Sequence, residues 1–138
     1  MSTRANIILK DADGGELIFY RHHDGMPERT LPTLKEFMQK VKTGKIRDNV
    51  SQAGGWLVLI GAKEYYKTSD MDHFEDWKGG SYEPDTKISS DINYLYILDL
   101  GENHIKVCDP HYADYNDDPI NAHAEKYVLK TITDFGSE

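Results

Sequence analysis

Two short stretches near the N-terminus have the pattern of β-strands. Residues 5–10 (ANIILK) are rich in Ile and Leu, and residues 17–22 (LIFYRH) alternate between two faces. One face of the second stretch carries Leu17, Phe19 and Arg21, and the other carries Ile18, Tyr20 and His22. The DADGG sequence between the stretches is a strong turn signal. The pattern therefore predicts an N-terminal hairpin.

Apolar residues then recur at helical spacing, at Leu31, Leu34, Met38 and Val41. Thr30 or Thr33 can cap this helix, and Glu36 follows Thr33 by three residues, as in a capping box. Gly44 is expected to end the helix, because glycine accepts the left-handed conformation common at helix C-termini.

A second helix is expected to begin with Asp48 as its cap. The helical period is followed by Val50, Ala53, Leu57, Ile60 and Glu64. Residues 54–61 (GGWLVLIG) carry three glycines that lower helix propensity, and WLVLI also fits a buried strand. We expect helix here, because the helical pattern starts before the glycines and continues into AKEYY.

The second half of the chain carries further strand patterns. Residues 91–100 (DINYLYILDL) alternate most clearly, with Ile92, Tyr94, Tyr96 and Leu98 on one face. Residues 82–88, interrupted by Pro84, and residues 104–109 are also expected to be strands, while 68–80 and 111–119 have the composition of loops. The tail, 120–135, fits helix or strand. The order predicts one α+β domain over 1–138, an antiparallel sheet with two helices inserted after the hairpin and lying over one face.

Composition narrows the classes of function. The 138 residues carry a formal net charge of -8, which disfavours broad binding to nucleic-acid backbones. No apolar run is long enough to cross a bilayer, and the N-terminus MSTRAN has no apolar signal region, so we expect a cytoplasmic protein. The single cysteine, Cys108, suits a reducing compartment.

The stretch FYRHHDGMPE, residues 19–28, concentrates chemistry in one place. His22 and His23 are adjacent on a strand and point to opposite faces, so they are poorly placed to share a metal ion. A metal site would need help from His104, Cys108, Asp109 or His111. No phosphate loop, nucleophile elbow or paired metal motif appears in the sequence. We therefore expect neither a cofactor, nor a metal, nor an enzymatic activity.

A ligand-binding interpretation uses other residues. Arg21 and Arg47 can fork onto a phosphate, and Asn93 offers both a donor and an acceptor. Flat faces for a base or sugar come from Phe19, Tyr20, Trp56, Trp77, Tyr82, Tyr94 and Tyr96. Each aromatic alone is equally explained by packing in a sheet. Together they suit a nucleotide-sized ligand.

The pattern STRANIILKDADGGELIFYRHHDGMPE and the later DINYLYILDL resemble a widespread type of small phage and prophage protein, in blocks scattered over residues 5–100. Within that type, the arrangement is similar to the first described Thoeris anti-defence family. Those proteins are non-enzymatic sponges that bind cyclic ADP-ribose isomers made by bacterial immune TIR proteins, and some hold cyclic oligonucleotides. They have an antiparallel sheet with two helices inserted after the second strand, and form dimers and larger assemblies.

The resemblance implies a homo-oligomer in the cytoplasm of an infected bacterium, with a cyclic nucleotide as its partner. It implies ligand contacts from Tyr82 and Asn93 and from an aromatic residue at the end of the second strand, Phe19 or Tyr20. Arg21 joins them as the cation of the same strand end. The family's late arginines are missing here, so Lys126 and Lys130 would replace them without the planar fork of arginine. The alternative is an acidic inhibitor that binds a host defence protein directly, such as an anti-CRISPR protein or a nucleic-acid mimic. The charge of -8 favours it, with acids concentrated at 70–76 and 109–118.

Overall fold

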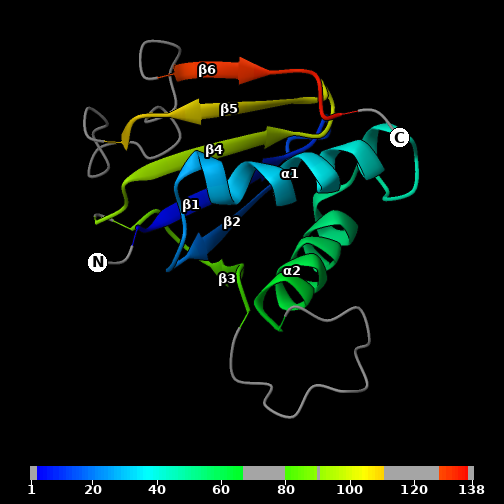
Figure 1. Ribbon diagram of the computed structural model, residues 1–138. Coiled ribbons are helices and arrows are strands. Elements are labelled where there is room, and N and C mark those ends of the chain that lie inside the picture. Colours follow the sequence, from blue (N-terminus) through cyan, green and yellow to red (C-terminus); the bar gives the residue numbers. More distant parts are fainter. Residues whose placement is uncertain (1–2, 67–79, 90, 111–127, 137–138) are drawn as a thin grey trace.

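The computed structural model describes residues 3–66, 80–89, 91–110 and 128–136. Within them, six strands form one sheet and two helices lie over one of its faces (Figure 1). The elements are β1 Ala5–Lys10, β2 Glu16–Arg21, α1 Pro27–Lys42, α2 Val50–Tyr66, β3 Glu83–Asp85, β4 Tyr94–Asp99, β5 His104–Cys108 and β6 Val128–Ile132. The predicted α+β class, with both helices inserted after the N-terminal hairpin, is confirmed.

The strands run in the order β3-β2-β1-β4-β5-β6. Four of the five pairings are antiparallel, as expected, but the central pair, β1 with β4, is parallel. A parallel neighbour requires a long crossover. Here α1, α2 and β3 together form the crossover. Strand β4 therefore starts at the same end of the sheet as β1 and runs beside it in the same direction.

Helix α1 begins at Pro27, before both of the threonines, Thr30 and Thr33, that were expected to cap it. Pro27 occupies its first turn, where the fixed φ of proline suits a helix start and its missing N–H is no loss. Thr30 and Thr33 are buried inside the helix instead, where their hydroxyls bond to other segments of the chain. The predicted end of the helix is confirmed, because Gly44 follows it with a φ of +82°.

Helix α2 is continuous through residues 54–61, so the helical prediction for GGWLVLIG is confirmed. Its cap is Asn49 rather than Asp48. The Asn49 side-chain oxygen accepts from the backbone N–H groups of Ser51 and Gln52, at 3.0 and 3.3 Å. Gly61 lets the helix approach Tyr82, the residue before β3, since a Cβ atom there would lie 2.6 Å from Cδ2 of Tyr82.

The main core lies between the helices and the sheet. It combines Ile7, Leu9, Phe19, Tyr96 and Leu98 from the strands with Leu34, Phe37, Met38 and Leu57 from the helices. A smaller apolar cluster lies on the other face, around Ile8, Leu95 and Ile97. Residues 86–89 are tied to that face by buried Asn6, whose Oδ1 accepts from the N–H of Ser89 at 2.8 Å.

The remaining sequence expectations are met in part. The strand expected over 82–88 is reduced to Glu83–Asp85, and the tail forms strand β6 over Val128–Ile132. The expected loop 111–119 and nearly all of 68–80 lie outside the described residues. Neither helix in the described ranges combines the length and the apolar character needed to cross a bilayer.

Candidate functional site

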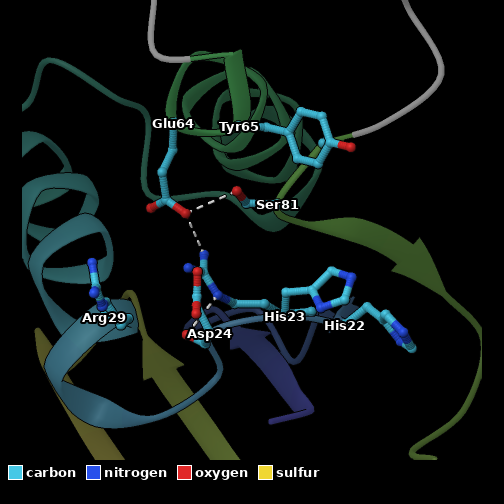
Figure 2. Close-up of a pocket in the computed structure, with 9 residues that line it drawn as sticks. His22, His23, Asp24, Arg29, Glu64, Tyr65 and Ser81 are labelled. Atoms are coloured by element: carbon cyan, nitrogen blue, oxygen red, sulfur yellow. Dashed lines mark hydrogen bonds and ion pairs between the residues drawn. The ribbon is translucent and has the colours of Figure 1, made fainter. Parts of the chain in front are cut away.

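A polar pocket of about 350 Å³ opens where strand β2 ends. Its walls come from the turn after β2, the first turn of α1, the last turn of α2 and the approach to β3. Figure 2 shows Glu64 and Ser81 on the upper side, with Asp24, Arg29, His22 and His23 below them. The stretch that stood out in the sequence, FYRHHDGMPE, thus supplies much of the pocket.

The lower wall is a fixed turn. Asp24 adopts a left-handed φ of 57°, and the N–H of Gly25 donates to the Thr3 carbonyl at 2.9 Å. The Tyr96 hydroxyl donates to the Gly25 carbonyl at 2.6 Å, and the Thr30 hydroxyl donates to the Asp24 carbonyl at 2.8 Å. These bonds confirm the predicted turn and hold the adjacent pocket residues in place.

Arg21 forms the floor of the pocket and is 3% exposed. Its Nε donates to the Asp24 carbonyl at 3.1 Å, and its guanidinium carbon lies 5.1 Å from the ring centre of Tyr82. Its Nη1 lies 2.7 Å from Glu64 Oε1, but that oxygen is off the direction of the N–H bonds. The contact is therefore an ion pair without a well-formed hydrogen bond.

Glu64 is the counter-charge to this arginine. Its carboxylate accepts from the Thr33 hydroxyl through Oε2 and from the Ser81 hydroxyl through Oε1, the latter at 2.8 Å. The carboxylate is thus held by Thr33, Ser81 and Arg21. Its side chain is nevertheless 28% exposed and lines the pocket.

Tyr82 lies behind the floor, 1% exposed and packed against Gly61. Burial raises the pKa of its hydroxyl well above the usual value, so the group stays neutral. The hydroxyl is close to Thr33 and Arg21, but within the described residues no group is in hydrogen-bonding geometry with it. The pocket is thus backed by a buried polar atom that is unsatisfied.

Arg29 is the exposed cation of the pocket. No ion pair engages its guanidinium in the part of the chain that the structure describes. The charges of Arg21 and Arg29 balance those of Asp24 and Glu64, so the net charge of these four residues is zero. His22 is oriented by a hydrogen bond between its Nδ1 and the Tyr20 hydroxyl, 2.8 Å apart.

The structure brings three of the predicted ligand residues together and separates the others. Arg21, Phe19 and Tyr82 share the helix-covered side of the sheet, where Phe19 and Tyr82 are core residues. Tyr20 points to the opposite face. Asn93 is exposed, and its Oδ1 accepts from the Arg4 backbone at 3.1 Å.

Asn93 lines a different surface hollow, of about 400 Å³, with Thr3, Tyr94, Asp109 and Leu129. None of these residues lines the Arg21 pocket. Lys130 is exposed on β6, opposite Val107. Lys126 and Trp77 lie outside the described residues. The proposed pairing of Tyr82 with Asn93 on one ligand is therefore not assembled within the pocket at β2.

Five residues that line the pocket were not named as site residues from the sequence: Arg29, Glu64, Tyr65, Gly80 and Ser81. Glu64 did leave a signal, because it continues an apolar helical stripe. A carboxylate at such a position needs a buried partner, and Arg21 is the cation on the inward face of its strand. Ser81 and Arg29 gave no comparable signal, since both lie in segments with ordinary surface composition.

The described residues hold no group of three or more His, Cys, Asp or Glu side chains that could bind a metal ion. His111, one of the helpers weighed for such a site, lies outside them. Cys108 is buried in β5, and burial raises its pKa to about 11. It is therefore a packed thiol at neutral pH, as expected for a strand interior.

Comparisons with protein-family models, curated proteins and solved structures found no match to this chain. The resemblance to the Thoeris anti-defence family therefore stays a prediction, and the geometry of the pocket is the independent starting point for function.

Proposed function

We propose that this protein binds a small phosphate-bearing nucleotide of the cyclic ADP-ribose type in the pocket at the end of β2 and holds it without cleaving it. In this proposal it acts as a phage-encoded sponge in the cytoplasm of an infected bacterium. It removes an immune signal from solution, works without a cofactor and associates with itself.

The observation that carries the proposal is the Arg29 guanidinium, which has no ion-pair partner among the described residues and lines a pocket whose floor is already fixed. The cavity, about 350 Å³, falls in the size range of small-molecule sites. Arg29 presents a planar donor fork to this space, and such forks bind phosphate oxygens in pairs.

Arg21 is not free to bind a phosphate directly, which is the role expected for it from the sequence. Its guanidinium is engaged by Glu64, the Asp24 carbonyl and the Tyr82 ring. It is therefore proposed to shape the floor, while Arg29 makes the direct phosphate contact. The resemblance of the N-terminal pattern to the cyclic ADP-ribose sponges supports the choice of ligand class.

The proposal is tested by calorimetric titration with a panel of cyclic ADP-ribose isomers and cyclic oligonucleotides. At least one is expected to bind, and heat denaturation of the complex should release it chemically intact. Arg29→Ala should weaken binding about tenfold to a hundredfold, because it removes a charge-assisted contact. Arg47, the other phosphate-binding candidate from the sequence, is exposed and does not line this pocket, so Arg47→Ala removes the same charge and should leave affinity unchanged.

Three results would count against the proposal. They are the absence of binding across the panel, equal loss in the two arginine variants, and turnover of a ligand by substoichiometric protein. The alternative, an acidic inhibitor of a host defence protein, is supported by the net charge of -8. It predicts that no nucleotide binds, and that a complex with a defence protein weakens as salt is raised.

A further inference from the structure

Glu64 and Ser81, on the upper side of the pocket, present hydrogen-bond acceptors and no free donor. The Ser81 hydroxyl donates to Glu64 Oε1 at 2.8 Å, and its backbone N–H donates to the Gly61 carbonyl at 3.2 Å. The Thr33 hydroxyl is likewise directed at Glu64 Oε2. What remains toward the cavity are the lone pairs of Ser81 Oγ and of the Glu64 carboxylate.

The free lone pairs of Glu64 and Ser81 repel a phosphate and attract a group that donates hydrogen bonds. A carboxylate near a phosphate-binding element is a known way of accepting the hydroxyl of a nucleotide ribose. An ammonium group is a poorer fit, because the Glu64 carboxylate is already paired with the Arg21 guanidinium at 2.7 Å. A neutral donor, such as a sugar hydroxyl, meets both conditions.

We infer that Glu64 and Ser81 form a ribose-hydroxyl subsite, which orients the ligand with its sugar toward α2 and its phosphate toward Arg29. The inference rests on the proposed function and adds the selectivity of the site. Figure 2 shows the corresponding division, with Glu64 and Ser81 together on one side and Arg29 on the other. Arg21 is a positioning residue here, since it holds the Glu64 carboxylate in place through the 2.7 Å ion pair.

The test compares two probes, cyclic ADP-ribose and an analogue that lacks ribose hydroxyls, by calorimetric titration. Hydrogen bonds to a charged group correspond to about tenfold to a hundredfold in affinity. The wild-type protein should therefore prefer the hydroxylated probe by at least about tenfold. Glu64→Gln and Ser81→Ala should each bring the ratio of the two affinities toward one, whereas Arg29→Ala should weaken both probes and preserve the ratio.

Glu36→Gln is the matched control, because it makes the same chemical change at an exposed position on α1. Its affinity ratio should equal that of the wild type. Circular dichroism melts establish that each variant is folded, and Ser81→Ala decides the matter if Glu64→Gln fails to fold.

The outcomes separate the two proposals. Equal binding of the probes by the wild type overturns the ribose subsite and leaves the proposed function standing. A preference that survives in both Glu64→Gln and Ser81→Ala also overturns the subsite. Failure of both probes to bind overturns the proposed function for this ligand class and the subsite with it.

Discussion

Helix α2 contacts the β1–β2 hairpin through polar residues near both of its ends, and the two contacts differ in chemistry. At the start of the helix, Asp11 in the hairpin turn accepts from the backbone N–H of Val50 at 3.0 Å. At the last turn, Arg21 at the end of β2 pairs with Glu64 at 2.7 Å. In each case one charged hairpin residue reaches the helix.

The Asp11 end is fully satisfied. The carboxylate also accepts from the N–H groups of Gly15 and Asp13, at 2.8 and 3.0 Å. The Arg21 end has a buried tyrosine hydroxyl without a partner, a pocket and the exposed Arg29. The comparison suggests that the first end serves stability, while the second sacrifices some stability to keep polar groups ready for a ligand.

The largest expected change in the free energy of unfolding comes from removing the ion pair between Arg21 and Glu64. Removing one partner of a buried ion pair costs about 3–5 kcal/mol, and the partial exposure of Glu64 reduces this to roughly 2–3 kcal/mol for Arg21→Ala. Arg47→Ala, the exposed control, should change the free energy of unfolding by less than about 0.5 kcal/mol. Urea denaturation measures both variants. Equal stabilities of Arg21→Ala and Arg47→Ala would show that the ion pair does not stabilise the attachment of α2 to the hairpin.

A second variant tests how tightly the last turns of α2 pack on Tyr82. A Cβ atom at Gly61 would lie 2.6 Å from the Tyr82 ring and 2.9 Å from its backbone nitrogen. Gly61→Ala should therefore destabilise by roughly 2 kcal/mol. Gly55→Ala, in the same helix with nothing within 4 Å, should stabilise by about 0.5–1 kcal/mol. Opposite signs in thermal melts are the expected result, and a stabilising Gly61→Ala would contradict the close approach.

Tyr82→Phe removes the unsatisfied hydroxyl and keeps the ring beneath Arg21. Because a buried polar atom without a partner carries a desolvation cost, the variant should be more stable by about 1 kcal/mol. Chemical denaturation measures the change. A loss of stability would show that the hydroxyl has a partner in solution, and would weaken the contrast between the two ends of α2.

The smallest expected effect is at Asp11, and it depends on pH. The N–H groups of Val50 and then Gly15 lower the pKa of Asp11 in the folded protein. The stability it contributes is therefore complete above the unfolded pKa, near 4, and is lost as pH falls through the lower folded pKa. Asp11→Asn should have a lower melting temperature at neutral pH and a flatter decline in acid. Asp13→Asn, at the exposed neighbouring acid, should behave like the wild type.

The sequence predicts the framework well because the framework depends on local patterns. The apolar stretch ANIILK, the alternation in LIFYRH and the DADGG turn between them specify the hairpin, and the helical pattern that continues through GGWLVLIG correctly predicts a helix despite its glycines. The parallel pairing of β1 with β4 could not be predicted this way, since register between distant strands depends on how the helices pack between them.

The site was harder to predict than the fold. Phe19 and Tyr82 were assigned to ligand contact by residue type, yet both fill the core, because an aromatic on an inward strand face is buried whenever a helix covers it. Arg29 and Ser81 acquire their position only from folding, which brings α1 and the approach to β3 to the same strand end. Glu64 was also not predicted as a site residue, although its place in the apolar stripe of α2 was a usable signal of a buried partner.

The most direct test of the central claim is to map the ligand on the labelled protein by amide chemical shifts during titration with cyclic ADP-ribose. The account predicts the largest changes around residues 21–29, 61–64 and 80–82, with none at the Asp11 turn. Changes concentrated at Asn93, Tyr94 and Leu129 would place the ligand in the other hollow and contradict the account, as would a spectrum that does not change.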